Sequence, residues 1–314
     1  MIYRATLITA ILMVFAVSLL AHQQIERPMH LKAMPRWKCD RIVSMAPSIT
    51  ETLYALGLGD RVVGVTRNST YPPEAKDKAR VGSYFDPNFE AILALKPDLV
   101  IMLEEQEKSS PGFAKLELET LVVSNQTLQG IIESFRVIGR VCGKGPEGRR
   151  MAASYENRLR QIREKTRDLP RPSVLFAVDR TFGCGHLADV YVAADDDYLD
   201  EMVELAGGRN ACRQRGIRYP IVSSEGLLWL NPDVIVDLVP SITLDEYGRS
   251  AILDDWNDLW RLSAVEHHRV LIFSQDYAFI PGPRFIRLVE DLARAIHPEV
   301  FWDRSEGLDF NIAP

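Results

Sequence analysis

The sequence has little of the side-chain chemistry that metal centres and nucleophilic enzymes require. Its 314 residues include four cysteines and six histidines, and no two cysteines stand in the C-x-x-C spacing of a zinc knuckle. The adjacent pair His267 and His268 would point to different faces of a helix, and the acidic run 195–197 completes no zinc or manganese site. Neither G-x-S-x-G nor a Cys/His nucleophile pattern occurs. We therefore expect no catalytic residue, no metal site and no intrinsic cofactor.

An excess of positive charge is also missing. The formal net charge is −6 and the isoelectric point is about 5.6, whereas nucleic-acid-binding proteins usually carry a basic face. We therefore exclude nucleic acid as a partner. With 46% hydrophobic and 25% charged residues, the composition is that of a globular protein, and the length suits one large or two medium domains.

An apolar run stands at the N-terminus, where Arg4 precedes seventeen uncharged residues and the polar HQQIER follows them. The run is slightly long for a signal peptide and slightly short for a membrane span. Residues 1–22 are thus predicted to be a signal peptide or an uncleaved N-terminal membrane anchor. Either one places the rest of the chain in the periplasm or another extracytoplasmic space. Cys39 lacks the small-residue context of a lipoprotein signal, which argues against a lipid anchor.

All four cysteines follow that run. An exported protein can form disulfides, and four thiols allow three pairings that the sequence does not rank. We expect one or two disulfides, with buried free thiols as the alternative. The cysteines are Cys39, Cys142, Cys184 and Cys212.

Strands alternate with helices over residues 40–146. The S-x-x-E spacing from Ser48 to Glu51 is typical of a capping box at a helix start. Alternation of this kind predicts a lobe with a parallel sheet and helices on both faces. The expected strands are 42–45, 62–65, 99–103 and 121–124, and the expected helices are 50–56, 89–95 and 128–141.

A long connecting helix is predicted over 147–169, because charges are dense and Met151, Tyr155, Leu159 and Ile162 recur at helical spacing. A second alternating lobe follows over 172–300. Its expected elements include a strand at 174–178, a helix at 198–206, a strand at 270–273 and a helix at 284–296. The G-x-G-x-x-G match at 143–148 follows a helix instead of a strand, which argues against a phosphate loop.

One phrase occurs twice, as ILALKPDLVI at 92–101 and LLWLNPDVIV at 227–236. In each copy a helix is expected to end before the proline, the aspartate to satisfy the turn, and a strand to follow. Glu90 and Glu225 both stand seven residues before the proline. An α/β protein can contain such a segment twice by chance. The matching glutamates outside the ten residues favour two related lobes.

The order and spelling of several motifs resemble the helical-backbone class (class III) of periplasmic binding proteins, in the Fe/B12 periplasmic-binding family. The resemblance covers about residues 40–297 and implies an α/β fold of two Rossmann-like lobes joined by one long backbone helix. It is carried by RIVSMAPSITETLYALGLGDRVVGV, YPPEA, VGSYFDPNFEAILALKPDLVI, YLDEMVELAGGRNA and SSEGLLWLNPDVIV.

The resemblance also implies a function, that of the solute-binding protein of an ABC importer. Such a protein would hold a metal chelate between its lobes, namely cobalamin or another corrinoid, a ferric siderophore or haem, and deliver it to a permease dimer with its ATPase. Glu90 and Glu225 align with glutamates that dock on permease arginines. The alternative is that both glutamates only favour their helix dipoles.

By the same resemblance, loops from both lobes line the ligand cleft. Aromatic rings with a few polar groups suit a large chelate, although Tyr84 and Tyr277 could equally be ordinary loop aromatics. The stretch 180–197 either adds Arg180, Phe182 or His186 to the cleft or is a loop. The expected cleft residues are Pro47, Ser48, Arg67, Asn68, Tyr84, Phe85, Asp276, Tyr277 and Phe279.

Two other classes of function stay open at this stage. The two-lobed arrangement also resembles metal chelatases and nitrogenase-type subunits, which would place a His or Glu pair in the cleft and usually work in the cytoplasm. A membrane-tethered ligand sensor is the other alternative, and it would keep the N-terminal segment uncleaved.

Overall fold

The computed structural model describes residues 37–109, 111–195 and 197–300. The predicted signal peptide or anchor at 1–22 lies outside the described residues. Within the described part, none of the helices has the length and apolar character needed to cross a bilayer.

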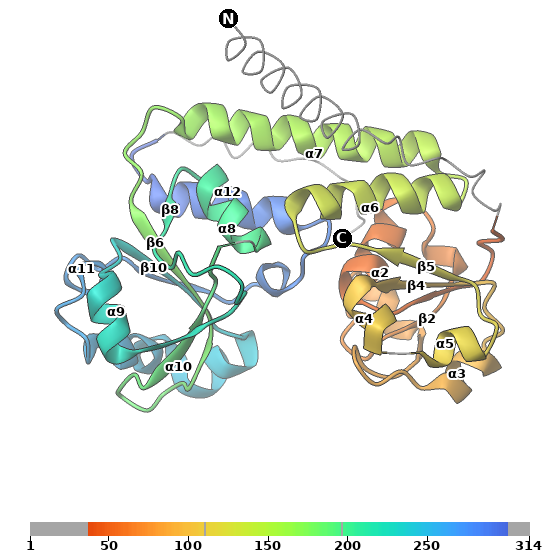
Figure 1. The fold of residues 1–314 in the computed structure, drawn as a ribbon, viewed down its shortest axis with the longest axis horizontal. Coiled ribbons are helices and arrows are strands. Elements are labelled where there is room, and N and C mark those ends of the chain that lie inside the picture. The colour runs from red at the N-terminus through yellow and green to blue at the C-terminus, as the bar shows by residue number, and fades with distance from the viewer. Residues whose placement is uncertain (1–36, 110, 196, 301–314) are drawn as a thin grey trace, which may run out of the picture. The chain divides into compact units, whose positions relative to one another are not determined.

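The N-terminal lobe is built on a parallel sheet with the strand order β3-β2-β1-β4-β5 (Figure 1). The chain starts in the middle of the sheet, winds to one edge and then to the other, so a crevice forms at the carboxyl ends of β1 and β4. The strands are β1 (Ile42–Ser44), β2 (Val62–Val65), β3 (Ala79–Arg80), β4 (Leu99–Leu103) and β5 (Thr120–Val123). The helices are α2 (Pro47–Ala55), η1 (Gly59–Arg61), η2 (Pro73–Asp77), α3 (Phe89–Ala94), α4 (Glu104–Ser109), α5 (Gly112–Lys115) and α6 (Leu128–Val141).

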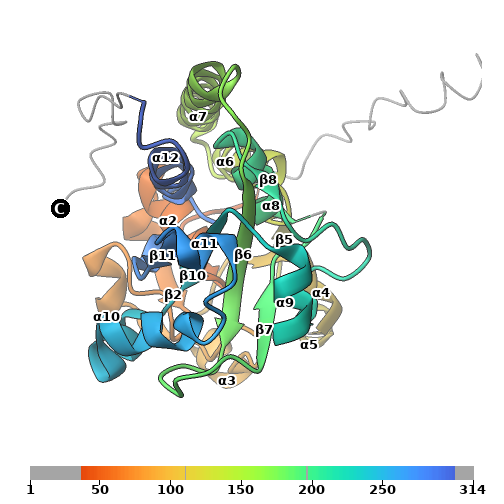
Figure 2. The same ribbon diagram turned by 90° about the vertical axis from the view of Figure 1, so that its left-hand side faces the viewer.

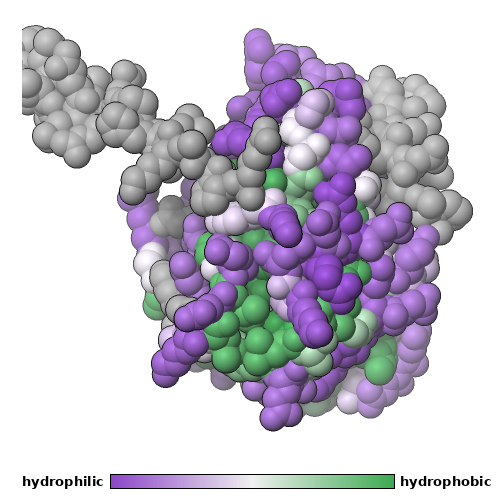
Figure 3. Space-filling model, turned by 90° about the vertical axis from the view of Figure 1, so that its right-hand side faces the viewer, coloured by the Kyte–Doolittle hydropathy of each residue, from purple (hydrophilic) through white to green (hydrophobic). Residues whose placement is uncertain are grey.

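Alternate residues of the central strands enter different cores. In β4, Leu99, Ile101 and Leu103 pack with α2 and α6, whereas Val100 and Met102 pack with α3 and α5. Both faces of the sheet are therefore buried, as its apolar strands predict. Figure 3 views the side of this lobe that faces away from the second lobe, where an apolar area is bordered by polar residues.

The C-terminal lobe holds a second sheet in the order β11-β10-β6-β7-β9, with β8 beside β6. Figure 2 looks onto this lobe and shows α9 at the outer side of β7. The strands are β6 (Ser173–Arg180), β7 (Asp189–Val192), β8 (Arg209–Asn210), β9 (Ile221–Ser223), β10 (Val234–Leu238) and β11 (Val270–Phe273). The helices are α8 (Tyr198–Leu205), α9 (Ser224–Leu230), α10 (Ser241–Asn257), α11 (Ser263–Glu266), η3 (Asp276–Phe279) and α12 (Phe285–Ile296).

This second sheet is mixed, because β7 runs antiparallel to both β6 and β9. The chain returns from β6 to β7 through the loop 181–188 without an intervening helix. Gly183 and Gly185 adopt φ near +70° in that loop, a conformation that glycine takes without strain. The stretch 180–197, expected to be a loop or part of the cleft, therefore contains a strand.

One long helix, α7 (Gly145–Thr166), lies along both lobes (Figure 1). It starts and ends slightly earlier than the predicted range 147–169. An added Cβ at Gly148 would lie 2.4 Å from the carbonyl oxygen of Phe135, so glycine lets α7 pack closely against α6. That packing explains a glycine of the G-x-G-x-x-G match without a phosphate.

The two lobes share one apolar core. A single cluster of buried side chains continues from the inner faces of both sheets through α6, α7, α8 and α12. Tightly packed cores deform little. The lobes are therefore joined by packing as well as by the chain, which opposes a wide hinge motion.

The repeated phrase occupies the same corner in both lobes. The Asp98 carboxylate accepts hydrogen bonds from the backbone N–H groups of Asp40 and Arg41, each at 3.0 Å, just ahead of β1. The Asp233 carboxylate accepts one at 2.8 Å from Ser173, the first residue of β6. Each aspartate thus secures the start of the neighbouring strand, instead of the turn that we expected it to satisfy.

One disulfide joins Cys39, ahead of β1, to Cys142 at the end of α6, with Cα atoms 5.3 Å apart. Cys184 is an exposed free thiol and Cys212 a buried one. One of the one or two expected disulfides is therefore present. The sulfur of Cys39 is engaged in this bond and so cannot carry a lipid.

Replacing both Cys39 and Cys142 with serine is expected to lower the free energy of unfolding by about 2–4 kcal/mol, because the bridge constrains a long loop in the unfolded chain. The bonded residues are 103 positions apart. Urea unfolding of the oxidised chain and the double variant measures the difference. Cys184→Ser is the matched control and should change stability by less than about 0.5 kcal/mol. An unchanged double variant would contradict the prediction.

Candidate functional site

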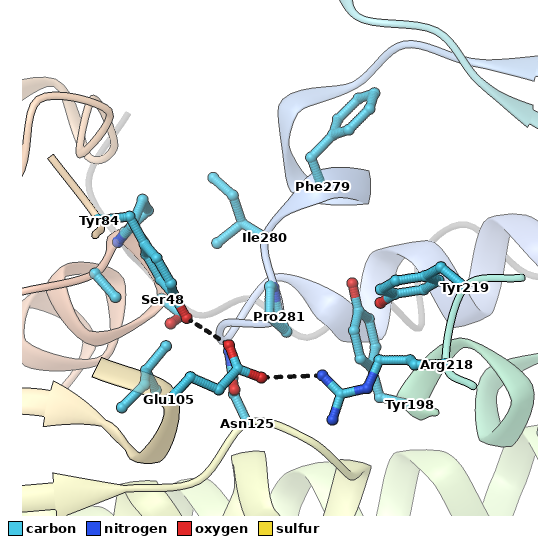
Figure 4. Close-up of a pocket in the computed structure, with 13 residues that line it drawn as sticks. Ser48, Tyr84, Glu105, Asn125, Tyr198, Arg218, Tyr219, Phe279, Ile280 and Pro281 are labelled. Atoms are coloured by element: carbon cyan, nitrogen blue, oxygen red, sulfur yellow. Dashed lines mark hydrogen bonds and ion pairs between the residues drawn. The ribbon is translucent and has the colours of Figure 1, made fainter. Parts of the chain in front are cut away.

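A pocket of about 310 Å³ opens between the two lobes (Figure 4). On the N-terminal side it is formed by the segments that follow β1, β4 and β5, which is the crevice expected from the strand order, and by Tyr84 after β3. The N-terminal lobe contributes Ala46, Pro47, Ser48, Tyr84, Leu103, Glu105 and Asn125, and the C-terminal lobe contributes Tyr198, Arg218, Tyr219, Phe279, Ile280 and Pro281.

An ion pair crosses this pocket. Glu105 in the first turn of α4 and Arg218 ahead of β9 lie 3.0 Å apart, and Figure 4 shows them reaching toward each other. The Tyr84 hydroxyl donates to the other Glu105 oxygen at 3.1 Å. On the far side, Asp197 lies 3.3 Å from Arg218 Nε and accepts a 3.0 Å hydrogen bond from the Tyr219 hydroxyl. A continuous polar chain therefore links the lobes across the pocket.

The carboxylates around Arg218 favour the charged form of its guanidinium. Partial burial opposes its charge, but the hydrogen bond to Glu105 and the charge of Asp197 raise the pKa of Arg218 overall. The Arg218 guanidinium thus lies between two carboxylates, Glu105 at 3.0 Å and Asp197 at 3.3 Å. The cation in the pocket wall is therefore already paired within the protein before any ligand arrives.

The tyrosines of the pocket are held protonated. Burial, reinforced by the neighbouring carboxylates, raises the pKa of Tyr84, Tyr198 and Tyr219 well above the ordinary value. Each ring therefore offers an apolar face and a neutral hydroxyl. None of the three is prepared to act as a phenolate.

A second ion pair joins the lobes outside the pocket wall. Arg284, the N-cap residue of α12, donates to both oxygens of Glu51 on α2, at 3.0 and 2.7 Å, and to Asp276 at 2.7 Å. The Tyr71 ring lies 3.8 Å from the guanidinium carbon. The Arg284 and Glu51 side chains are 5% and 1% exposed. This pair ties α2 of the N-terminal lobe to the start of α12.

The predicted capping box from Ser48 to Glu51 is wrong. Helix α2 begins at Pro47, its N-cap Ala46 makes no side-chain cap, and Glu51 is committed to Arg284. Proline is favoured in the first helical turn, because its missing N–H has no partner there in any case. The helix therefore starts three residues earlier than Thr50.

The structure brings four of the nine expected cleft residues into the pocket wall, namely Pro47, Ser48, Tyr84 and Phe279. Phe85 lies beside them, 66% exposed and packed edge-on against Tyr84. The other four do not line this pocket. Arg67 and Asn68 are exposed on the loop after β2, Asp276 pairs with Arg284, and the Tyr277 hydroxyl donates to Asp291 at 2.6 Å.

Sequence reasoning missed several pocket residues. Glu105 and Asn125 are each the second residue after the end of β4 and β5, so the rule that ligands bind beyond the carboxyl ends of parallel strands would have found them. Arg218 and Tyr219 stand in an irregular segment before the short edge strand β9, where no motif marks them. Tyr198 opens a helix and carries no signal of its own.

The suggestion that Arg180 faces the cleft is wrong. Its side chain is 0% exposed and pairs with Asp237 at 2.8 Å and Asp255 at 2.6 Å. Asp255 also accepts the backbone N–H groups of Gly183 and Gly185. Arg180 and Asp255 therefore fix the loop 181–188, and Phe182 lies over the guanidinium within that loop, at 4.6 Å.

Glu90 and Glu225 occupy the same position in related helices. Each is the second residue of its helix and is exposed, and the N-cap side chain before it, Asn88 or Ser223, accepts the N–H of the third residue. No ion pair of either glutamate is found within the described residues. Both carboxylates are thus presented to solvent by matching frames.

No group of three or more His, Cys, Asp or Glu side chains that could hold a metal occurs in the part of the chain that the structure describes. The pocket wall offers tyrosines, one amide and paired charges. This arrangement can surround and orient a preformed ligand through ring faces and hydrogen bonds.

Known proteins resemble this chain over most of its length. It is 33% identical over 271 residues to an uncharacterised ABC transporter substrate-binding lipoprotein, YvrC, of Bacillus subtilis (strain 168), covering 83% of this chain and 81% of the relative. It is 28% identical over 260 residues to the vitamin B12-binding protein of Vibrio cholerae, covering 81% and 87%. The solved periplasmic heme-binding protein RhuT from Roseiflexus sp. RS-1 superimposes with a TM-score of 0.70 at 28% identity, covering 82% and 98%.

The fold agrees with these relatives, since two Rossmann-like α/β lobes are joined by one long backbone helix, as the sequence predicts. The sequence profile of the family described as periplasmic binding protein matches residues 42–277, which is most of the chain. The chain therefore belongs to the periplasmic binding protein family.

Proposed function

We propose that this chain is the extracytoplasmic solute-binding protein of an ABC importer and that it carries a cobalamin-class chelate between its lobes. The observation that carries the proposal is the interlobe pocket, in which three tyrosines and one amide surround an ion pair that is already formed. Such a wall offers aromatic area and neutral hydrogen-bonding groups. The Vibrio cholerae relative that is named for vitamin B12 supports the choice.

Charge separates the candidate chelates. Cyanocobalamin has no net charge and is rimmed with amides, which suit hydroxyls and the Asn125 side chain. Haem carries two propionates, and these would have to compete with Glu105 and Asp197 for Arg218. A tyrosine ligates ferric iron as a phenolate, the state that burial and nearby carboxylates disfavour here. Haem is therefore the second candidate, supported by the likeness to a heme-binding protein.

The size of the pocket is consistent with a partly enclosed chelate. A volume of about 310 Å³ accommodates only part of a corrinoid. Phe85 and Phe279, at 66% and 36% exposed, extend the apolar wall toward solvent. We infer that the bound chelate projects between the lobe rims, and that Arg67 and Asn68, on the exposed loop after β2, approach it only there.

Delivery requires a membrane partner. We propose that Glu90 and Glu225 dock on basic side chains of a permease dimer associated with its ATPase, because both are exposed, unpaired within the described residues and equivalently placed. Benzoylphenylalanine at position 93 or 228, beside the two glutamates, would identify this permease by photo-crosslinking in the cells that make the chain. Docking on the outer face of a permease requires that the mature chain is in the periplasm or another extracytoplasmic space.

The enzyme and sensor alternatives have less support. Among the described residues that line the pocket there is one glutamate and no histidine, whereas a chelatase-type cleft would offer a His or Glu pair. A membrane-tethered sensor would require that ligand binding leave permease ATPase activity unchanged. The absence of ATPase stimulation by the loaded chain would favour that alternative.

Titration calorimetry with cyanocobalamin, haemin and ferrichrome tests the ligand. Cyanocobalamin is expected to bind with a dissociation constant of about 1 µM or tighter, and haemin at least about tenfold more weakly. Glu105→Gln should strengthen haemin binding, because it removes one negative charge and releases Arg218. Tighter binding of haemin than of cyanocobalamin by the unaltered chain would overturn the charge argument, and no binding of any probe would overturn the chelate proposal.

A further inference from the structure

The outward side of α9 is apolar where a solvated helix would be polar. Leu227 is fully buried against the sheet, which places Leu228 and Trp229 on the outward side together with Glu225. Trp229 is 84% exposed, and the ring contacts found among the described residues do not include it.

Helix α3 of the other lobe carries the matching surface with one difference. Ile92 is buried, and Glu90, Leu93 and Ala94 are exposed. Leu93 and Leu228, equivalent in the repeated phrase, are 42% and 41% exposed. The next position is alanine in the N-terminal lobe and tryptophan in the C-terminal lobe. The two lobes thus present the same carboxylate and leucine, but only one presents an aromatic anchor.

We propose that Trp229 is an apolar anchor that seats the C-terminal lobe on one permease subunit, one helical turn from the contact made by Glu225. This inference rests on the proposed docking function. A two-fold permease dimer offers the same surface to both lobes. The depression that Trp229 fills on one subunit would therefore face Ala94 on the other and stay open, so docking engages the two subunits unequally.

Charge and residue type favour a protein partner of this kind over other occupants. A tryptophan beside a carboxylate suits a basic protein surface with an apolar depression, because tryptophan is enriched among the residues that dominate protein interfaces. An anionic lipid surface would be repelled by Glu225 and by the net charge of −6. A second copy of this chain would bring Glu225 near another Glu225 in a two-fold contact.

The test measures stimulation of ATPase activity in nanodiscs holding the permease and ATPase identified by crosslinking, with the full exported chain loaded with cyanocobalamin. Trp229→Ala is expected to raise the half-maximal concentration about 10- to 30-fold, as for loss of an interface hot spot. Ligand affinity should not change. Adding Ala94→Trp to Trp229→Ala should recover part of the loss, because the equivalent depression on the other subunit becomes filled.

Trp260→Ala is the matched control. Trp260 is 67% exposed in the connection between α10 and α11, and the Arg261 guanidinium lies 5.0 Å from its ring. Its replacement should leave stimulation unchanged. An equal loss in both variants would overturn the assignment to α9, and so would a Trp229→Ala variant that behaves like the unaltered chain.

Two further readouts separate this inference from the proposed function. If the double variant Glu90→Lys with Glu225→Lys loses ATPase stimulation and Trp229→Ala retains it, the anchor is rejected and the docking proposal stands. If both variants retain stimulation, the anchor and the docking proposal are both rejected. If Trp229→Ala abolished self-association measured by light scattering, the tryptophan would contact a second copy of the chain. If it abolished flotation with phosphatidylglycerol vesicles, the tryptophan would contact a membrane. Either result would show that the permease assignment is wrong.

Discussion

Arg284→Met is expected to lower the free energy of unfolding by about 3–5 kcal/mol, because it leaves the buried Glu51 carboxylate without its cation. Burial alone would lower the pKa of Arg284, but hydrogen bonds and charges from Glu51 and Asp276 raise it. The guanidinium therefore stays charged in the folded protein. Because the pair joins α2 to α12, its loss weakens the contact between the lobes as well. Urea unfolding measures the change.

Two variants make this prediction specific. Adding Glu51→Gln to Arg284→Met should recover much of the loss, because the remaining buried group is then neutral. Arg294→Met removes an arginine from the same helix, where its partners Asp291 and Glu290 lie at 3.1 and 3.8 Å and the arginine is 31% exposed. That control should cost less than about 1 kcal/mol. Equal effects of Arg284→Met and Arg294→Met would show that the interlobe pair contributes no more than a surface pair.

Local patterns in the sequence predicted most of the strands and the helices α2, α3, α6, α7, α8, α9 and α12, but not α4, α5, α10 or α11. The strands 62–65, 99–103 and 270–273 and the helix 128–141 match the structure because short apolar runs and helical spacing are local signals. The antiparallel β7 was missed. It follows a glycine-rich loop instead of a helix, and its pairing with β6 and β9 depends on contacts distant in sequence.

The ion pairs that organise the site could not be predicted in the same way. Glu51 and Arg284 are 233 positions apart, and Glu105 and Arg218 are 113 positions apart. Nothing near Glu51 distinguishes a buried partner of arginine from a capping residue, because both roles use a glutamate in the first turns of a helix. The repeated segment did predict matching positions, because two related lobes place equivalent residues at equivalent helix-to-strand connections.

Glu90→Lys combined with Glu225→Lys is expected to weaken stimulation of the permease ATPase at least about 100-fold, because two charge-assisted contacts are replaced by two repulsions. Affinity for cyanocobalamin should be unchanged, since neither residue lines the pocket. Calorimetry of the variant checks affinity, and the ATPase assay in nanodiscs checks docking. A loss of ligand affinity would show that the glutamates act on the cleft.

Glu164→Lys with Asp168→Lys provides the matched charge control. Both residues are exposed at the end of α7, which Figure 1 shows on the opposite side of the lobes from α3, and the variant changes the net charge by the same amount. An equal loss of stimulation there would mean that overall charge governs the encounter. Unchanged stimulation would assign the effect to the two helix starts. The single variants then compare the contributions of the two lobes to docking. Because Trp229 lies beside Glu225, the contact of the C-terminal lobe is the better packed one, so Glu225→Lys should reduce ATPase stimulation more than Glu90→Lys.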